Sequence, residues 1–165
     1  MEFIDQTLNW IKGEIFEGRI IVLFVIITIV SALLFSKTGT TPGAKAMLFP
    51  LFAVGILLTA IAGGLLYNNP KRAEEFTKAY ESNPSEFIQS EKERLEAFMS
   101  WYSKTRYIMA ALSILGIGFI MFWATPIGWA IGIALLLTGL AAFVIDHFFE
   151  ERAEIYYQQI ARAIE

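Results

Sequence analysis

The chain has 165 residues, of which 56% are hydrophobic and only 18% are charged, and its formal net charge is −3. A soluble domain of this size exposes too much surface to bury that much apolar side chain, so the composition indicates an integral membrane protein. The chain has no cysteine and one histidine, which excludes disulfides, thiolate metal sites, cysteine nucleophiles and haem held by two histidines.

Four apolar stretches are candidates to cross a bilayer, which takes about 17–25 helical residues. They are residues 20–35, 46–67, 107–124 and 127–145. Helices are the expected form, because barrel strands would alternate apolar and polar residues over about ten positions. We therefore expect an all-α integral membrane protein whose four transmembrane helices form an antiparallel bundle.

The segments outside these spans also show helical signals. Residues 1–19 have apolar side chains at helical spacing, which predicts an amphipathic helix, and Gly13 and Gly18 are candidate bends. In the segment 68–106, Asn69-Pro70 is expected to begin a second helix. Asn83 and Glu86 are expected to begin a third, which runs on into span three.

The remaining connections are short or uninterrupted. Residues 36–45 form a turn-rich linker, and Thr125-Pro126 predicts a tight turn between the last two spans. The fourth span has no helix breaker through residues 146–165. The helices are thus expected to extend beyond the membrane at the end that carries both termini.

Charge is distributed very unevenly between the two sides. Residues 1–19, 68–106 and 146–165 carry 11 of the 13 basic residues and all 16 acidic residues, a net charge of −5. Because lysine and arginine accumulate on the cytoplasmic side, we expect both termini in the cytoplasm and the chain in the inner (cytoplasmic) membrane of a bacterium. The net negative charge argues against nucleic acid and against a polybasic patch for anionic lipid.

Small residues are expected where helices meet in lipid. Gly128 and Gly132 form a GxxxG pattern in the fourth span. Packing within the bundle is the simpler explanation, and a homo-oligomer seam is the alternative.

Several carboxylates and the histidine lie just beyond the spans, on helices expected to face one another. Carboxylates with an imidazole, projecting inward from bundle helices, can hold iron, manganese or zinc. The candidate ligands of such a divalent metal are Glu14, Glu17, Glu91, His147, Glu150 and Glu154. The alternative is a set of solvated helix ends, with Glu91 paired to Lys92 or Arg94.

Asp146 lies at the expected hydrocarbon boundary, where an unpaired carboxylate is costly. Arg19 and Arg106 are expected at a similar depth. We therefore expect an ion pair between Asp146 and one of these arginines.

The sequence contains no complete catalytic constellation and resembles no family closely enough to name. A non-enzymatic interaction or scaffold protein, acting through cytoplasmic helices on a protein partner or its own oligomer, is the first hypothesis. A divalent-metal protein is the second. A binder of lipid or a small hydrophobe is the third, since 14 phenylalanines suit an apolar cavity.

Overall fold

The computed structural model describes residues 3–164, which are helical apart from short connections. The helices are α1 (Phe3–Thr38), α2 (Pro42–Ala46), α3 (Leu48–Ser82), α4 (Pro84–Met99), α5 (Tyr102–Phe122) and α6 (Pro126–Ile164). Within these residues, four helical segments are long and apolar enough to cross a membrane. The all-helical fold and the four candidate spans are thus as predicted.

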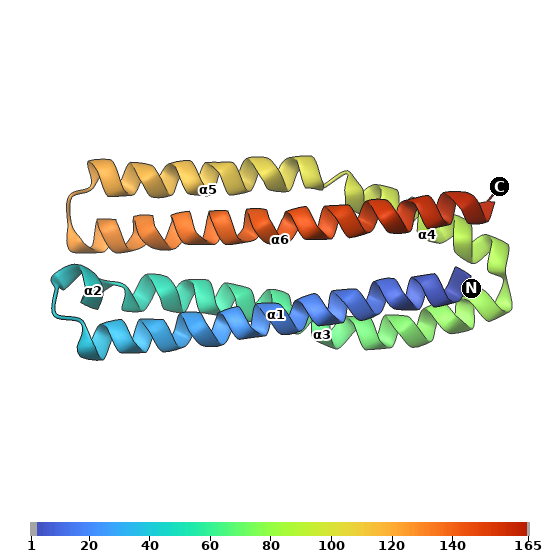
Figure 1. Ribbon diagram of the computed structural model, residues 1–165, viewed down its shortest axis with the longest axis horizontal. Coiled ribbons are helices and arrows are strands. Elements are labelled where there is room, and N and C mark those ends of the chain that lie inside the picture. Colours follow the sequence, from blue (N-terminus) through green and yellow to red (C-terminus); the bar gives the residue numbers. More distant parts are fainter. Residues whose placement is uncertain (1–2, 165) are drawn as a thin grey trace.

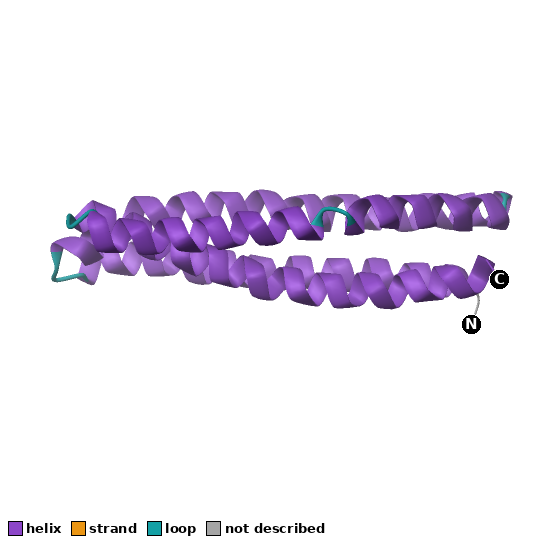
Figure 2. Cartoon of the chain, turned by 90° about the horizontal axis from the view of Figure 1, so that it is seen from above, coloured by secondary structure: helices purple, strands orange, loops and turns teal. Residues whose placement is uncertain are grey.

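The helices pair along their lengths. Helix α1 packs against α3, and α5 packs against α6 (Figure 1). Both termini lie at one end of the molecule, where α4 packs against α6 (Figure 1). The connection through α2 and the turn between α5 and α6 lie at the other end. Figure 2 shows the same long bundle from above, with a loop between α4 and α5 partway along it.

The large buried side chains are concentrated near the termini. We call residues 3–19, 68–106 and 146–164 the terminal half, and residues 20–67 and 107–145 the apolar half. The main apolar cluster, made of Phe3, Trp10, Ile11, Phe87, Leu95, Tyr102, Ala153, Tyr156 and Ile160, lies in the terminal half. In the apolar half the exposed surface is rich in Ile, Leu and Phe, as expected of helices that face lipid.

Glycines bring α5 and α6 into close contact. A Cβ added to Gly116 would lie 2.7 Å from the carbonyl oxygen of Gly132 and 2.7 Å from the amide nitrogen of Leu136. Gly128, the other glycine of the GxxxG pattern, lies against Trp123 at the turn. Both glycines of the pattern therefore pack within this chain, where close approach replaces the hydrophobic force that lipid removes.

Two expected interruptions are absent from the described helices. Helix α3 continues through Pro70, and α1 continues past Gly13 and Gly18. The proline removes one backbone hydrogen bond, but the long packing of α3 on α1 keeps the helix in one piece. Gly18 instead admits Leu66 of α3, which would lie 3.1 Å from an added Cβ.

One interruption was not expected. Helix α4 ends at Met99, and α5 begins at Tyr102, whereas the sequence predicts a continuous helix into span three. The Ser100 hydroxyl donates to the Ala97 carbonyl at 2.7 Å, which gives that carbonyl a partner at the end of α4. The predicted start of α4 is confirmed, since the Asn83 side chain accepts from the Glu86 amide at 3.3 Å.

Candidate functional site

A network of charged and polar side chains runs through the interior of the terminal half and links α1, α3, α4 and α6. We call it the polar network, and it consists of Thr7, Glu14, Glu17, Asn69, Arg72, Glu91, Arg94, Arg152 and Tyr156. Periodic apolar residues of these helices form the surrounding core, and the polar residues occupy core-facing positions between them.

Glu14 joins α1 to α3. Its side chain is only 7% exposed, and Arg72 Nη1 donates to its Oε2 at 3.2 Å. The same Nη1 donates to Asn69 Oδ1 at 2.9 Å. A buried carboxylate requires such a partner, because leaving it unpaired would carry the full cost of desolvation.

Glu91 joins α4 to α6 and α1. Arg94 holds this carboxylate with two hydrogen bonds, from Nε at 2.7 Å and from Nη2 at 2.8 Å. The Tyr156 hydroxyl lies 3.1 Å from Glu91 Oε2 and 2.8 Å from Thr7 Oγ1. Because a carboxylate accepts, Tyr156 donates to Glu91. The pairing with Arg94 is the alternative that the sequence left open.

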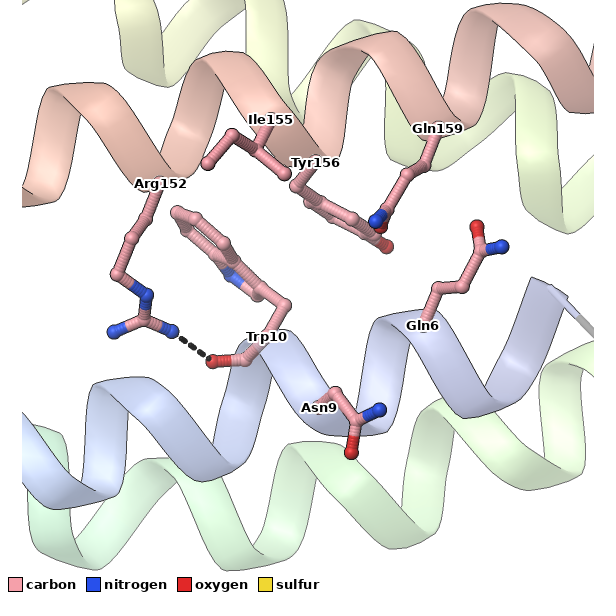
Figure 3. Close-up of a pocket in the computed structure, with 7 residues that line it drawn as sticks. All are labelled: Gln6, Asn9, Trp10, Arg152, Ile155, Tyr156 and Gln159. Carbon is pink, nitrogen blue, oxygen red and sulfur yellow. Dashed lines mark hydrogen bonds between the residues drawn. The ribbon is translucent and has the colours of Figure 1, made fainter. Parts of the chain in front are cut away.

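Arg152 joins α6 to α1. It forms an ion pair with Glu17 and donates from Nη2 to the Trp10 carbonyl at 3.0 Å. The Trp10 and Tyr156 rings stack with centroids 5.3 Å apart. Figure 3 shows Trp10, Arg152 and Tyr156 together at a surface hollow of about 250 Å³ between α1 and α6. The amide side chains of Gln6, Asn9 and Gln159 also line this hollow.

Burial changes the acidity of the carboxylates on α1. It raises the pKa of Glu14, and the nearby Arg72, Arg94 and Arg152 only partly offset that effect. Burial also raises the pKa of Glu17, against the opposing effect of Arg152. Both carboxyls therefore hold a proton more readily than in solution.

Three buried polar atoms near this network have no hydrogen-bond partner among residues 3–164: Glu17 Oε2, Asn69 Nδ2 and Tyr102 OH. Buried polar atoms of this kind bind internal water or a ligand in native proteins. The network can thus hold water in its interior. Among the hydrogen bonds of residues 3–164, none joins a side chain of the network to a histidine as a nucleophile would require.

The candidate metal ligands lie in different surroundings. Glu14, Glu17 and Glu91 face the interior and each pairs with an arginine. Glu150 forms an ion pair with Arg106, while His147 and Glu154 are exposed. Within residues 3–164, no three His, Asp or Glu side chains are grouped to hold a metal ion. A metal site stays a prediction from the sequence.

Asp146 has a different partner from the one expected. The Thr105 hydroxyl donates to its carboxylate, at 3.2 Å from Oδ1. Arg106 bonds to Glu150, one helical turn farther along α6, and Arg19 is exposed. The half-buried carboxylate of Asp146 thus accepts from a neutral hydroxyl, and Arg106 pairs with Glu150 instead.

Sequence reasoning missed the basic and aromatic half of the network, Arg72, Arg152 and Tyr156. Arg72 and Glu14 are 58 residues apart, and Tyr156 and Thr7 are 149 apart, so no local spacing connects them. A usable signal was the placement of Tyr156 on the apolar stripe of α6.

Comparisons with protein-family models, with curated proteins and with solved structures find no match to this chain.

Proposed function

We propose that this chain is a non-enzymatic interaction protein of the inner (cytoplasmic) membrane, which presents a rigid acidic hairpin to a basic protein partner. The hairpin consists of residues 68–99, the end of α3 and all of α4. The four helical spans of the chain run antiparallel in this proposal, with both termini and the hairpin in the cytoplasm. The observation that carries the proposal is the separation of charge between the inside and the outside of the terminal half.

Three arginines of the terminal half are partly buried against carboxylates of the polar network: Arg72, Arg94 and Arg152. The exposed side of the hairpin instead carries six carboxylates, Glu74, Glu75, Glu81, Glu86, Glu93 and Glu96. Only Lys71 and Lys78 are exposed basic residues of the same segment. Such a field attracts a positively charged surface and accelerates its association.

The polar network makes the hairpin rigid. Arg72 ties α3 to α1, and Glu91 ties α4 to α6 through Tyr156. A surface held in one conformation loses little entropy on binding. This favours a docking role over a role that needs the hairpin to move.

The membrane orientation can be tested by cysteine labelling, since the chain has no native cysteine. A membrane-impermeant maleimide should label Thr40→Cys in intact cells, and Ser82→Cys only after lysis. Labelling of Ser82→Cys in intact cells would contradict the proposed orientation.

The partner can be tested with a photo-crosslinking residue at the exposed Gln89 of α4, in cells that express the chain natively. We expect one discrete adduct, which the triple variant Glu81→Lys, Glu86→Lys, Glu93→Lys abolishes. Glu154→Lys is the matched control, because Glu154 is exposed on α6, outside the hairpin. The same adduct yield in the triple variant, with its helicity unchanged, would overturn the proposal.

A further inference from the structure

A second hollow lies on α3 and α4, immediately beyond the second apolar span. It has a volume of about 520 Å³ and is lined by Asn68, Lys71, Arg72, Glu75 and Arg94. Three of these five side chains are cationic and one is anionic. Arg72 and Arg94 are paired with Glu14 and Glu91, which lie behind the hollow. The positive charge is therefore at the lining, while its counter-charges lie deeper, in the interior.

The cations of this hollow keep donors for a ligand. Arg72 donates to Glu14 and Asn69 through Nη1 alone, and Arg94 uses Nε and Nη2 on Glu91. Arg72 Nε and Nη2 and Arg94 Nη1 have no hydrogen bond within residues 3–164. A guanidinium with free N–H groups is well suited to a phosphate.

Lys71 places the hollow at the level of the interface. Its ammonium lies 3.8 Å from the ring centroid of Tyr67, and Tyr67 is the last residue of the second predicted span. Tyrosines at span ends sit at the depth of lipid headgroups. The lysine is exposed and belongs to no ion pair in the described chain.

The apolar helices beside the hollow leave room for acyl chains. Helix α3 packs on α1 and α5 packs on α6, while α3 and α5 form no extensive contact with each other over residues 3–164. Their side chains remain exposed along the span, among them Ile56 and Leu57 of α3 and Ile114 and Leu115 of α5. Lipid is the natural neighbour of these faces.

We propose that this hollow binds the headgroup of an anionic phospholipid, with the phosphate between Lys71, Arg72 and Arg94 and the acyl chains along α3. Basic hollows at the cytoplasmic ends of transmembrane helices suit such headgroups. This inference does not depend on the proposed protein partner, although Glu75 belongs both to the hollow and to the acidic surface proposed for that partner.

The test uses the full chain in a neutral detergent, with lipid binding followed by native mass spectrometry. Phosphatidylglycerol is titrated beside phosphatidylcholine and inorganic phosphate. We expect Lys71→Gln to weaken binding of phosphatidylglycerol about fivefold, since a basic residue near such a charge is worth about 1 kcal/mol. Lys78→Gln, two turns along α3 and paired with Glu74, is the matched control and should bind as the natural chain does.

Glu75→Gln gives a test in the opposite direction. It removes the one carboxylate that lines the hollow, so the affinity for phosphatidylglycerol should rise. Equal binding of phosphatidylcholine and phosphatidylglycerol, or equal binding by the Lys71→Gln and Lys78→Gln variants, would overturn the proposal. Inorganic phosphate that binds as tightly as phosphatidylglycerol would overturn its assignment to a lipid.

Discussion

The hydroxyl of Tyr156 lies 3.1 Å from Oε2 of Glu91, in the interior of the terminal half. Tyr156 is on α6 and Glu91 is on α4, and each is only 2% exposed. This contact connects the last helix to the hairpin, and Thr7 extends the connection to α1. Three helices therefore meet at one phenol.

Replacing Tyr156 with phenylalanine should lower the free energy of unfolding by about 1–3 kcal/mol, the value of a buried hydrogen bond to a charged group. The ring and its stacking on Trp10 remain, so the variant should still fold. Thermal unfolding in detergent, followed by far-UV circular dichroism, measures the change.

Tyr157→Phe is the matched control for this variant. Tyr157 is the next residue of the same helix. Its hydroxyl donates to Glu96 at 2.8 Å, but this hydrogen bond lies at the exposed surface. Exposed pairs contribute little, so its unfolding temperature should hardly change. Equal losses in the two variants would contradict the role assigned to the Tyr156–Glu91 contact.

Glu91→Gln should be at least as destabilising as Tyr156→Phe, by about 2 kcal/mol or more. It leaves Arg94 without the carboxylate that accepts two of its hydrogen bonds, and an uncompensated charge in the interior is costly. Glu93→Gln, on the exposed face of the same helix, should have little effect. The two variants are compared by thermal unfolding under identical conditions.

The four apolar helices could be predicted from the sequence because a bilayer imposes length and composition on any span. The inward position of Glu91 was also predictable, because Ile88 and Leu95 share its face of α4. These inferences depend on residues close together in the chain. The break at Ser100 and the continuity at Pro70 depend on packing between helices, which no local pattern records.

The candidate site was predictable only in part, for the same reason. The sequence indicated that the carboxylates near the membrane needed partners, and a metal ion and arginines were the candidate partners. It did not show that Glu14 would meet Arg72 or that Glu17 would meet Arg152, since these pairs join distant segments. The cationic lining of the hollow could not be inferred from the net negative charge of the terminal half, because a summed charge does not say where the individual charges lie.

Gly116→Ala should disrupt the packing of α5 on α6. The added methyl would lie 2.7 Å from backbone atoms of α6, and backbone cannot move aside as a side chain can. Overpacking of this kind costs about 1–3 kcal/mol. Gly118→Ala is the control two residues away, because its methyl meets no atom within 4 Å. Thermal unfolding in detergent should show a loss for Gly116→Ala alone, and equal unfolding temperatures would contradict the close approach.

The pH dependence of stability should change in a defined direction in Glu14→Gln. Burial raises the pKa of Glu14 above its ordinary value of 4.5, so the folded state binds the proton more tightly than the unfolded state. The resulting stabilisation is full below the ordinary pKa and is lost as the pH rises through the raised value. Glutamine does not titrate and avoids this loss, and the attraction of Arg72 is already part of the net shift in the pKa of Glu14.

The unfolding temperature of Glu14→Gln, relative to the natural chain, should therefore rise as the pH increases above the ordinary pKa of 4.5. Glu74→Gln should behave in the opposite way. The hydrogen bond from Lys78 lowers the pKa of Glu74 below its ordinary value of 4.5. The natural chain therefore gains stability as the pH rises to about that value, and the glutamine variant does not. Because Glu74 is exposed, its effect should also be the smaller one and should fade in high salt. A difference for Glu14→Gln that stays flat across the range would show that the Arg72 pairing fully offsets the burial of Glu14.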